Sequence, residues 1–224
     1  MIILFIILGI SPLFLFIASV NIGWNFYIRS FNKSLHSGNE VMLTFDDGPH
    51  PGNTEKVLDI LAQSNTKAVF FLIGERAIEH PEIVRRIVKE GHLAGIHSMR
   101  HTAGFTVAPA KMVTGDLDAC RKILEDLSGE KIYLFRPPFG VTNFNIAKAV
   151  RKLNLKTIGW SVRSFDTAIK SPEKVIDRVA GRIHPGAIVL LHDRLPGSAE
   201  ILSGILREIK NRGLKPTIFK EIYD

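Results

Sequence analysis

From residue 40 onward, short apolar runs alternate with segments whose apolar residues repeat at helical spacing. Seven runs have the length and the β-branched, aliphatic or aromatic content of buried strands, and they span residues 41–45, 68–73, 93–96, 132–135, 156–161, 187–191 and 214–219. The intervening segments predict helices over 54–64, 109–127 and 144–153, and three more around Ile83, Val175 and Ile205. Because no linker and no repeat of fixed period interrupts this alternation, it predicts one domain with a parallel α/β fold.

The opening of the chain follows a different pattern, since no charged residue precedes Arg29. Residues 1–20 are almost wholly aliphatic or phenylalanine, and three aromatic residues follow within 24–27. About 20 apolar residues are enough for a helix to cross the hydrocarbon core of a bilayer, and aromatic residues suit its interface. We therefore expect one N-terminal transmembrane helix, a membrane anchor over residues 1–28.

A signal peptide is the alternative for this segment, either cleaved or kept as an uncleaved signal. No Lys or Arg precedes the run and residues 18–20 form a poor cleavage site, so we favour an anchor. Residues 29–39 are polar, which predicts a tether to a catalytic domain over 40–224. We expect a single-pass protein whose domain is extracytoplasmic, but the positive-inside rule, resting on Arg29 and Lys33 alone, favours the cytoplasm, so sidedness stays open.

Composition and charge narrow the classes of function. The chain has 224 residues, 46% of them hydrophobic and 23% charged, as in an ordinary globular protein. Its single cysteine, Cys120, excludes a disulfide framework and a multi-cysteine zinc site. The net charge is +7, but no basic cluster is interleaved with aromatic residues, so we expect no nucleic acid partner. We expect the catalytic domain to be monomeric.

Polar residues interrupt the apolar pattern mostly where predicted strands end. Five such clusters occur: Asp46-Asp47-Gly48, His97 to His101, Arg136 to Gly140, Asp166, and His192-Asp193. In a parallel barrel these strand ends share one rim, where catalytic groups collect. Five clusters at one rim therefore predict an active site there.

Each cluster has both an ordinary and a chemical interpretation. An Asp-Asp-Gly sequence often only forms a turn, but two adjacent carboxylates can also divide the roles of cation ligand and base. His97 and His101 are four residues apart, so on a helical turn both imidazoles can bind one metal ion, although such pairs are often surface residues. Next to the aspartates, they form a His-His-carboxylate set that suits zinc with an open position.

The motifs TFDDG (44–48), HSMRH (97–101), RPPFG (136–140), Asp166 and LLHD (190–193) occur in this order. They resemble those of the polysaccharide deacetylases with a NodB homology domain, carbohydrate esterase family 4. The resemblance covers residues 40–224 and implies an incomplete, distorted (β/α) barrel of about seven parallel strands. It also implies a metal-dependent hydrolase acting on carbon–nitrogen bonds other than peptide bonds. Its substrate would be an aminosugar-containing glycan, from which it removes N-acetyl or O-acetyl groups.

The resemblance implies a role for each motif residue. Asp47, His97 and His101 would bind Zn2+, or another divalent transition metal such as Co2+. Asp46 would act as the base toward a zinc-bound water that attacks the acyl carbonyl, and His192 as the acid toward the leaving nitrogen. Four further residues would assist: Arg136 orients Asp46, Asp166 tunes His192, the backbone N–H of Phe139 helps to form an oxyanion hole, and Leu190 lines the acyl pocket.

The sequence departs from the family pattern in ways that concern sugar preference. Arg163 and Thr167 stand where the family commonly has a second aspartate and a tryptophan. Ile96 precedes the histidine motif where asparagine is common, and the stretch 102–109 that follows this motif is longer and less polar.

Two other functions stay open at this point. One is deformylation or deacetylation of a lipid-linked aminosugar at the inner membrane, which the apolar N-terminus and the positive-inside signal favour. The other is a non-catalytic protein that binds a glycan or a membrane. The complete set of metal and acid positions argues against a pure binder, which needs neither.

Overall fold

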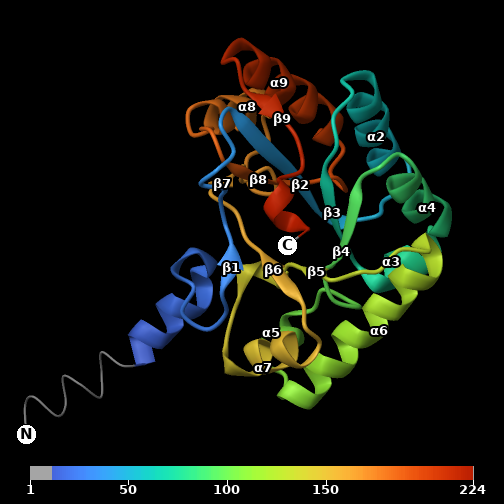
Figure 1. Ribbon diagram of the computed structural model, residues 1–224, viewed down its shortest axis with the longest axis vertical. Helices are drawn as coiled ribbons and strands as arrows, with labels where there is room; N and C mark the ends of the chain where they lie inside the picture. Colours follow the sequence, from blue (N-terminus) through green and yellow to red (C-terminus); the bar gives the residue numbers. More distant parts are fainter. Residues whose placement is uncertain (1–11, 224) are drawn as a thin grey trace, which may run out of the picture.

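The computed structural model describes residues 12–223, whose strands form one parallel sheet that curves into a half barrel (Figure 1). The order along the sheet is β1-β6-β5-β4-β3-β2-β8-β7, and β9 pairs with β2. The strands are β1 (Ser30–Phe31), β2 (Glu40–Gly48), β3 (Val69–Leu72), β4 (Leu93–Ile96), β5 (Leu134–Phe135), β6 (Lys156–Ile158), β7 (Val162–Arg163), β8 (Ile188–His192) and β9 (Lys215–Pro216). Because these pairings are parallel, the carboxyl ends of the strands lie at one mouth of the half barrel.

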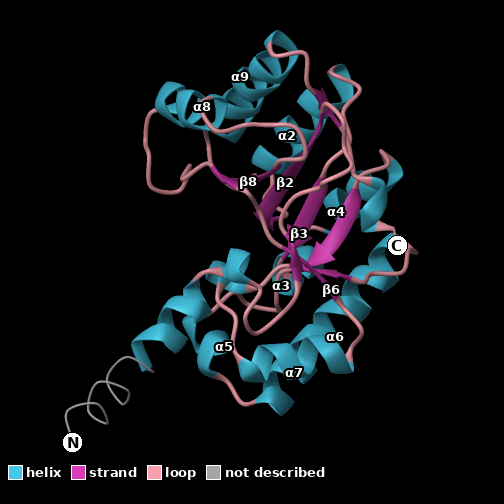
Figure 2. Cartoon of the chain, turned by 60° about the vertical axis from the view of Figure 1, so that its left-hand side comes forward, coloured by secondary structure: helices cyan, strands magenta, loops and turns pink. Residues whose placement is uncertain are grey.

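Helices surround this sheet on its outside (Figure 2). They are α2 (Asn53–Gln63), α3 (Gly74–Glu79), α4 (Pro81–Lys89), α5 (Ala103–Val107), α6 (Ala110–Ser128), α7 (Phe144–Lys152), α8 (Pro172–Ala180) and α9 (Ser198–Asn211). Two pairs of helices pack against each other, α6 with α7 and α8 with α9, at opposite ends of the molecule (Figure 1).

Two apolar layers hold the sheet in place, and the alternation along β2 separates them. Val41, Leu43 and Phe45 pack in the layer between the sheet and the helices, whereas Met42 packs in the layer inside the half barrel. The inner layer also takes Phe219 from the C-terminal segment. Since successive side chains of a strand face opposite sides, Thr44 and Asp46 continue the inward row toward the mouth.

The structure confirms the incomplete parallel barrel. All seven strands expected from the pattern are present, although β5 and β9 are reduced to two residues each. The pattern does not predict β1 and β7, because a strand of two residues has no measurable alternation. For the same reason it misses the short helices α3 and α5.

The expected transmembrane helix over residues 1–28 falls partly on residues 1–11, which lie outside the described part of the chain. Residues 12–20 are helical, and none of the helices among residues 12–223 is long and apolar enough to cross a membrane. This helix is fastened to the fold next to the mouth: the Ser19 hydroxyl donates to the Thr142 carbonyl at 2.6 Å, and the Thr142 N–H donates to the Ser19 carbonyl at 2.8 Å.

Residues 29–39, for which the sequence predicts a tether, are built into the fold. Ser30 and Phe31 form β1 and pair with β6. Lys33 forms a bridge with Ala187, just ahead of β8, and the Ser34 N–H donates to the Gly186 carbonyl at 2.9 Å. The polar residues of this stretch therefore satisfy hydrogen bonds across the open side of the barrel, so the folded unit begins before residue 40.

Candidate functional site

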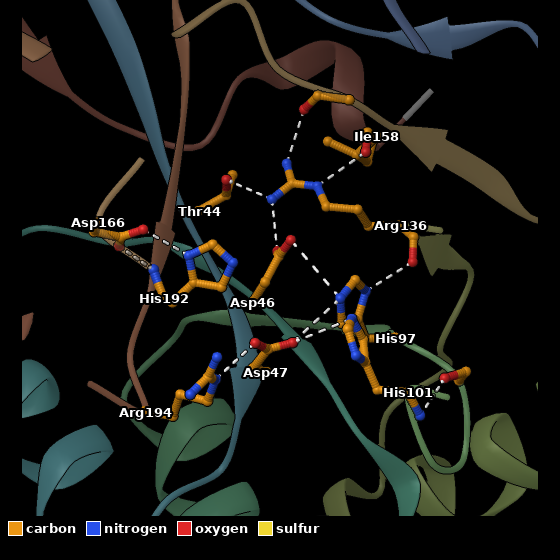
Figure 3. A network of polar contacts seen from close by, with 12 residues as sticks. Thr44, Asp46, Asp47, His97, His101, Arg136, Ile158, Asp166, His192 and Arg194 are labelled. Carbon is orange, nitrogen blue, oxygen red and sulfur yellow. Dashed lines mark hydrogen bonds and ion pairs between the residues drawn. The ribbon is translucent and has the colours of Figure 1, made fainter. Parts of the chain in front are cut away.

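The carboxylates of Asp46 and Asp47 both face the mouth of the half barrel, although they are adjacent in a strand (Figure 3). In a regular strand adjacent side chains point to opposite faces. Here the pairing between β2 and β3 shifts register between Asp46 and Gly48, and Asp47 has a φ of 72°. This bulge, in a left-handed conformation that aspartate tolerates better than most residues, turns Asp47 to the same side as Asp46.

Asp46 is held by a buried arginine, Arg136, which directly follows β5. Arg136 is fully buried, and its Nη1 donates to Asp46 Oδ1 at 2.7 Å and to the Thr44 hydroxyl at 2.8 Å (Figure 3). Its remaining donors bind the Ile158 carbonyl at 3.1 Å and the Gly159 carbonyl at 2.8 Å. One side chain therefore joins β2 to the end of β6 and fixes one oxygen of Asp46, leaving the other oxygen toward the mouth.

Asp47, His97 and His101 converge on one point. Asp47 Oδ1 lies 3.5 Å from Nε2 of each histidine, and one atom from each of the three residues lies within 4.8 Å of the others. His97 Nδ1 donates to the Arg136 carbonyl at 2.8 Å, which sets its tautomer and leaves Nε2 with a free lone pair. Asp47 Oδ1 is buried without a hydrogen-bond partner among the described residues. A carboxylate and two imidazoles with an orphaned oxygen fit a zinc-class ion with an open position.

The charges around this cluster favour the forms that bind metal. Burial raises the pKa of Asp47, but His97 and the Arg194 hydrogen bond more than offset it, so the net pKa lies below its usual value. Burial, together with the neighbouring His97, lowers the pKa of His101. An ionised aspartate and a neutral imidazole are the states that donate electron pairs to a metal ion.

His192 and Asp166 form a second, separate pair at the mouth. His192 Nδ1 lies 2.7 Å from Asp166 Oδ1, and the His192 backbone N–H donates to Asp166 Oδ2 at 2.8 Å. Burial lowers the pKa of His192, but the hydrogen bond and charge of Asp166 outweigh it, so the pKa lies above its usual value. Because Nδ1 is occupied, Nε2 is the atom left to exchange a proton with a substrate.

The last two predicted residues, Phe139 and Leu190, also lie at this mouth. Phe139 has a φ of 60°, its side chain is half exposed, and its ring centre lies 4.5 Å from that of His101. Leu190 is buried on β8 and pairs in register with Thr44. The structure thus brings together all the site residues that the sequence singles out.

Arg194 belongs to the site, although sequence reasoning misses it. Its Nε donates to Asp47 Oδ2 at 2.8 Å, so Asp47, like Asp46, has one oxygen tied to an arginine. The sequence signal is weak, because a lone arginine two residues after His192 looks like any surface cation. Thr44 is a second omission, since a threonine inside a strand is ordinary there.

The chain is similar to known polysaccharide deacetylases in both sequence and fold. A sequence model of the family described as polysaccharide deacetylase matches residues 33–158. A peptidoglycan-N-acetylglucosamine deacetylase from Bacillus cereus is 35% identical over 81% of this chain and 68% of its own length. The peptidoglycan-N-acetylmuramic acid deacetylase PdaA from Bacillus subtilis is 33% identical over 82% of this chain and 70% of its own. The crystal structure of the peptidoglycan N-acetylglucosamine deacetylase Bc1960 has a TM-score of 0.78 at 33% identity, covering 84% of this chain and 89% of that one.

Proposed function

The chain belongs to the polysaccharide deacetylase family, and on this premise we propose that it removes N-acetyl groups from aminosugar units of a glycan by metal-dependent hydrolysis. The observation that carries the proposal is the joint presence, at one mouth, of three groups. They are a carboxylate held by Arg136, a set of three metal-ligand side chains, and an imidazole held by Asp166. A protein that only binds glycans has no use for the last two.

Asp46 is the base in this proposal. Arg136 occupies its Oδ1, while its Oδ2 lies 3.9 Å from His97 Nε2, on the side of the three ligands. This second oxygen is therefore placed to accept a proton from the water that attacks the acyl carbon. His192 is the acid: Nε2 gives its proton to the amide nitrogen as the carbon–nitrogen bond breaks, and the products are acetate and a free amine.

Asp47, His97 and His101 would hold the metal ion, for which we propose zinc. Bound there, a divalent ion supplies Lewis acidity for the acyl carbonyl and lowers the pKa of water. The backbone N–H of Phe139 would face the developing oxyanion, and Leu190 would contact the methyl of the acetyl group.

The test is acetate release from defined substrates by the purified, zinc-loaded chain. N-acetylglucosamine oligomers and peptidoglycan fragments should both be assayed, with mass spectrometry locating each lost acetyl group. Asp46→Asn and His192→Ala should each lower the rate by about 10²–10⁴-fold, the usual effect of losing a general base or acid. Absence of acetate release from every N-acetylated glycan by the zinc-loaded wild type would contradict the proposal.

A lipid-linked aminosugar is the second candidate substrate, and the exposed aromatic surface near the mouth favours it. Phe14, Trp24 and Phe26 are about half exposed, and the Phe14 ring contacts the other two. Tyr27 links Phe26 to Phe144 on α7. An exposed apolar surface of this kind suits the interface of a membrane. Under this proposal, the chain is held at a membrane and acts on acyl groups, acetyl or formyl, close to it. Faster hydrolysis of a lipid-linked than of a soluble N-acyl aminosugar, in vesicles, would support it, and equal rates would contradict it.

A further inference from the structure

Arg163 lies at the mouth, on the side of His192, and has no role in the proposed catalytic mechanism. Arg163 ends β7 and pairs in register with Leu190 on β8, two residues before His192. Side chains of residues paired in register lie side by side on the same face of a sheet. The Arg163 guanidinium carbon also lies 5.8 Å from the ring centre of Trp160, a ring that is itself 5.6 Å from the Arg136 guanidinium. Arg163 therefore projects along the inner face, beside the proposed acyl pocket.

A second arginine and an aromatic ring complete this cationic cluster. Phe165 is more than one third exposed, and its ring centre lies 4.7 Å from the guanidinium carbon of Arg163 and 4.3 Å from that of Arg178. Arg178 comes from α8, and its Nε donates to the Arg163 carbonyl at 3.1 Å. Phe165 adopts a φ of 59°, a strained value for an aromatic residue, immediately before Asp166. The same loop that fixes the Asp166–His192 pair thus fixes the ring between the two arginines.

Neither arginine has an acidic partner within the described part of the chain. Ion pairs of at most 4.0 Å occur there for Arg86, Arg100, Arg121, Arg136 and Arg194, but for neither Arg163 nor Arg178. The nearest buried carboxylate in sequence, that of Asp166, is committed to His192. Two guanidinium groups that share one ring without an anion have unused donors for a planar, negatively charged ligand.

We propose that Arg163, supported by Arg178 across the Phe165 ring, binds the carboxylate of an acidic sugar unit, and so selects acidic over neutral N-acetylated glycans. This inference rests on the proposed deacetylation and names its substrate class. A guanidinium matches a carboxylate through two parallel N–H donors, and the exposed Phe165 ring suits the apolar face of a sugar ring. The carboxylate has two chemical sources: a lactyl ether on the acetylated sugar itself, as in N-acetylmuramic acid, or a uronic acid unit next to it.

Steady-state kinetics on matched oligosaccharides tests the proposal. Three substrates of equal length are compared with the zinc-loaded enzyme: neutral N-acetylglucosamine units, units that alternate with N-acetylmuramic acid, and units that alternate with a uronic acid. We expect kcat/KM to favour one acidic substrate over the neutral one, mainly through KM, and the favoured substrate identifies the source of the carboxylate. In Arg163→Gln this preference should fall about 10–100-fold, as for the loss of a charged hydrogen bond, while kcat on the neutral substrate stays within twofold.

Matched controls separate the local contact from general charge and from misfolding. Arg207→Gln removes one exposed positive charge on α9 and should leave the preference unchanged. Arg163→Lys should retain part of the preference, because it keeps the charge but loses the paired donors. Converting the substrate carboxylate to an amide should lower kcat/KM of the wild type by the same factor as the Arg163→Gln substitution does. The same conversion should not lower kcat/KM of Arg163→Gln any further. Urea unfolding midpoints within error of wild type establish that each variant is folded.

Calorimetric binding of the deacetylated acidic oligosaccharides distinguishes the two possible failures. If no glycan is hydrolysed but binding still weakens at least tenfold in Arg163→Gln, the proposed function fails and the carboxylate site stands. If glycans are hydrolysed, yet wild type and Arg163→Gln show the same ratio of kcat/KM for acidic and neutral substrates, the carboxylate site is overturned and the deacetylase activity stands.

Discussion

Replacing Arg136 by methionine will destabilise the fold strongly, independently of any effect on catalysis. Arg136 is fully buried, and its donors bind Asp46, the Thr44 hydroxyl and the carbonyls of Ile158 and Gly159. Methionine keeps most of the apolar stem but supplies no donor. The substitution therefore leaves the Asp46 carboxylate, only 4% exposed, without its counterion and leaves two buried carbonyls without a partner.

The expected cost follows from these lost partners. Removing one member of a buried ion pair costs about 3–5 kcal/mol, because the remaining charge stays buried and unpaired. For a domain of this size, such a loss lowers the midpoint of thermal unfolding by about 6–20 °C. The double variant Arg136→Met/Asp46→Asn removes the unpaired charge as well, so it should recover at least about 1 kcal/mol relative to Arg136→Met alone.

The assay is urea unfolding at pH 7, with all samples treated with a chelator so that metal binding does not enter the comparison. Arg194→Met is the matched control, because it also removes an arginine from a site aspartate, but the Arg194 side chain is 36% exposed. Asp47 is itself buried, but water reaches the Arg194 end of this pair, so Arg194→Met should lose clearly less stability than Arg136→Met. If Arg136→Met loses less than about 1 kcal/mol, or if the double variant is no more stable than Arg136→Met, the reasoning about a buried, mutually dependent pair is refuted.

Three further predictions concern metal, pH and a buried histidine. Elemental analysis should find one divalent ion per chain, chelation should abolish deacetylation, and Zn2+ or Co2+ should restore it; full activity in the metal-free chain would contradict the assigned ligands. In Asp166→Asn, the alkaline limb of the pH–rate profile should move to lower pH, because Asp166 raises the pKa of His192, the proposed acid. A shift confined to the acid limb would contradict the assignment of acid and base. Burial and the nearby Lys67 lower the pKa of His92 from 6.5 to about 4, so the unfolded chain binds more protons between these values. The stability that His92 contributes is complete above pH 6.5 and is lost as the pH falls to about 4, an effect of roughly 3 kcal/mol. His92→Gln keeps an acceptor for the Ala68 N–H, so its urea midpoint should fall less than that of wild type between pH 7 and pH 4; parallel losses would contradict the prediction.

The sequence predicts those parts of the fold in which many residues repeat one signal. Long elements such as β2 and the apolar face of α6 contain several periods of their pattern. The alternation of strands and helices can therefore be predicted from the sequence. The strands β1 and β7 form instead because they pair with β6 and β8. Each has only two residues, which is too short for an alternating pattern in the sequence. The stretch 29–39 is misjudged as a tether for a related reason, because polar residues look alike whether water or another strand satisfies them.

The candidate site divides in the same way. Part of the site is recognisable because carboxylate and imidazole side chains stand at the ends of apolar strands, where the fold brings them together. These residues are Asp46, Asp47, His97 and His192. The carboxylate of Asp47 reaches the same side as that of Asp46 only through the bulge at the end of β2, which periodicity does not predict. Arg194 escapes notice because its importance comes from a contact with Asp47 across the chain, not from its local pattern.

The several bonds of Arg136 have a consequence for how this chain can diverge in evolution. A lineage that gives up hydrolysis but still needs the folded domain is free to change the His192 side chain, whose Nε2 binds no other described residue, but it has to keep Arg136 and a hydrogen-bonding partner at position 46. An arginine at position 136 in a related sequence therefore reports that the barrel is intact, and says little about whether the chain is an enzyme. The residue at position 192 is the better marker of retained chemistry.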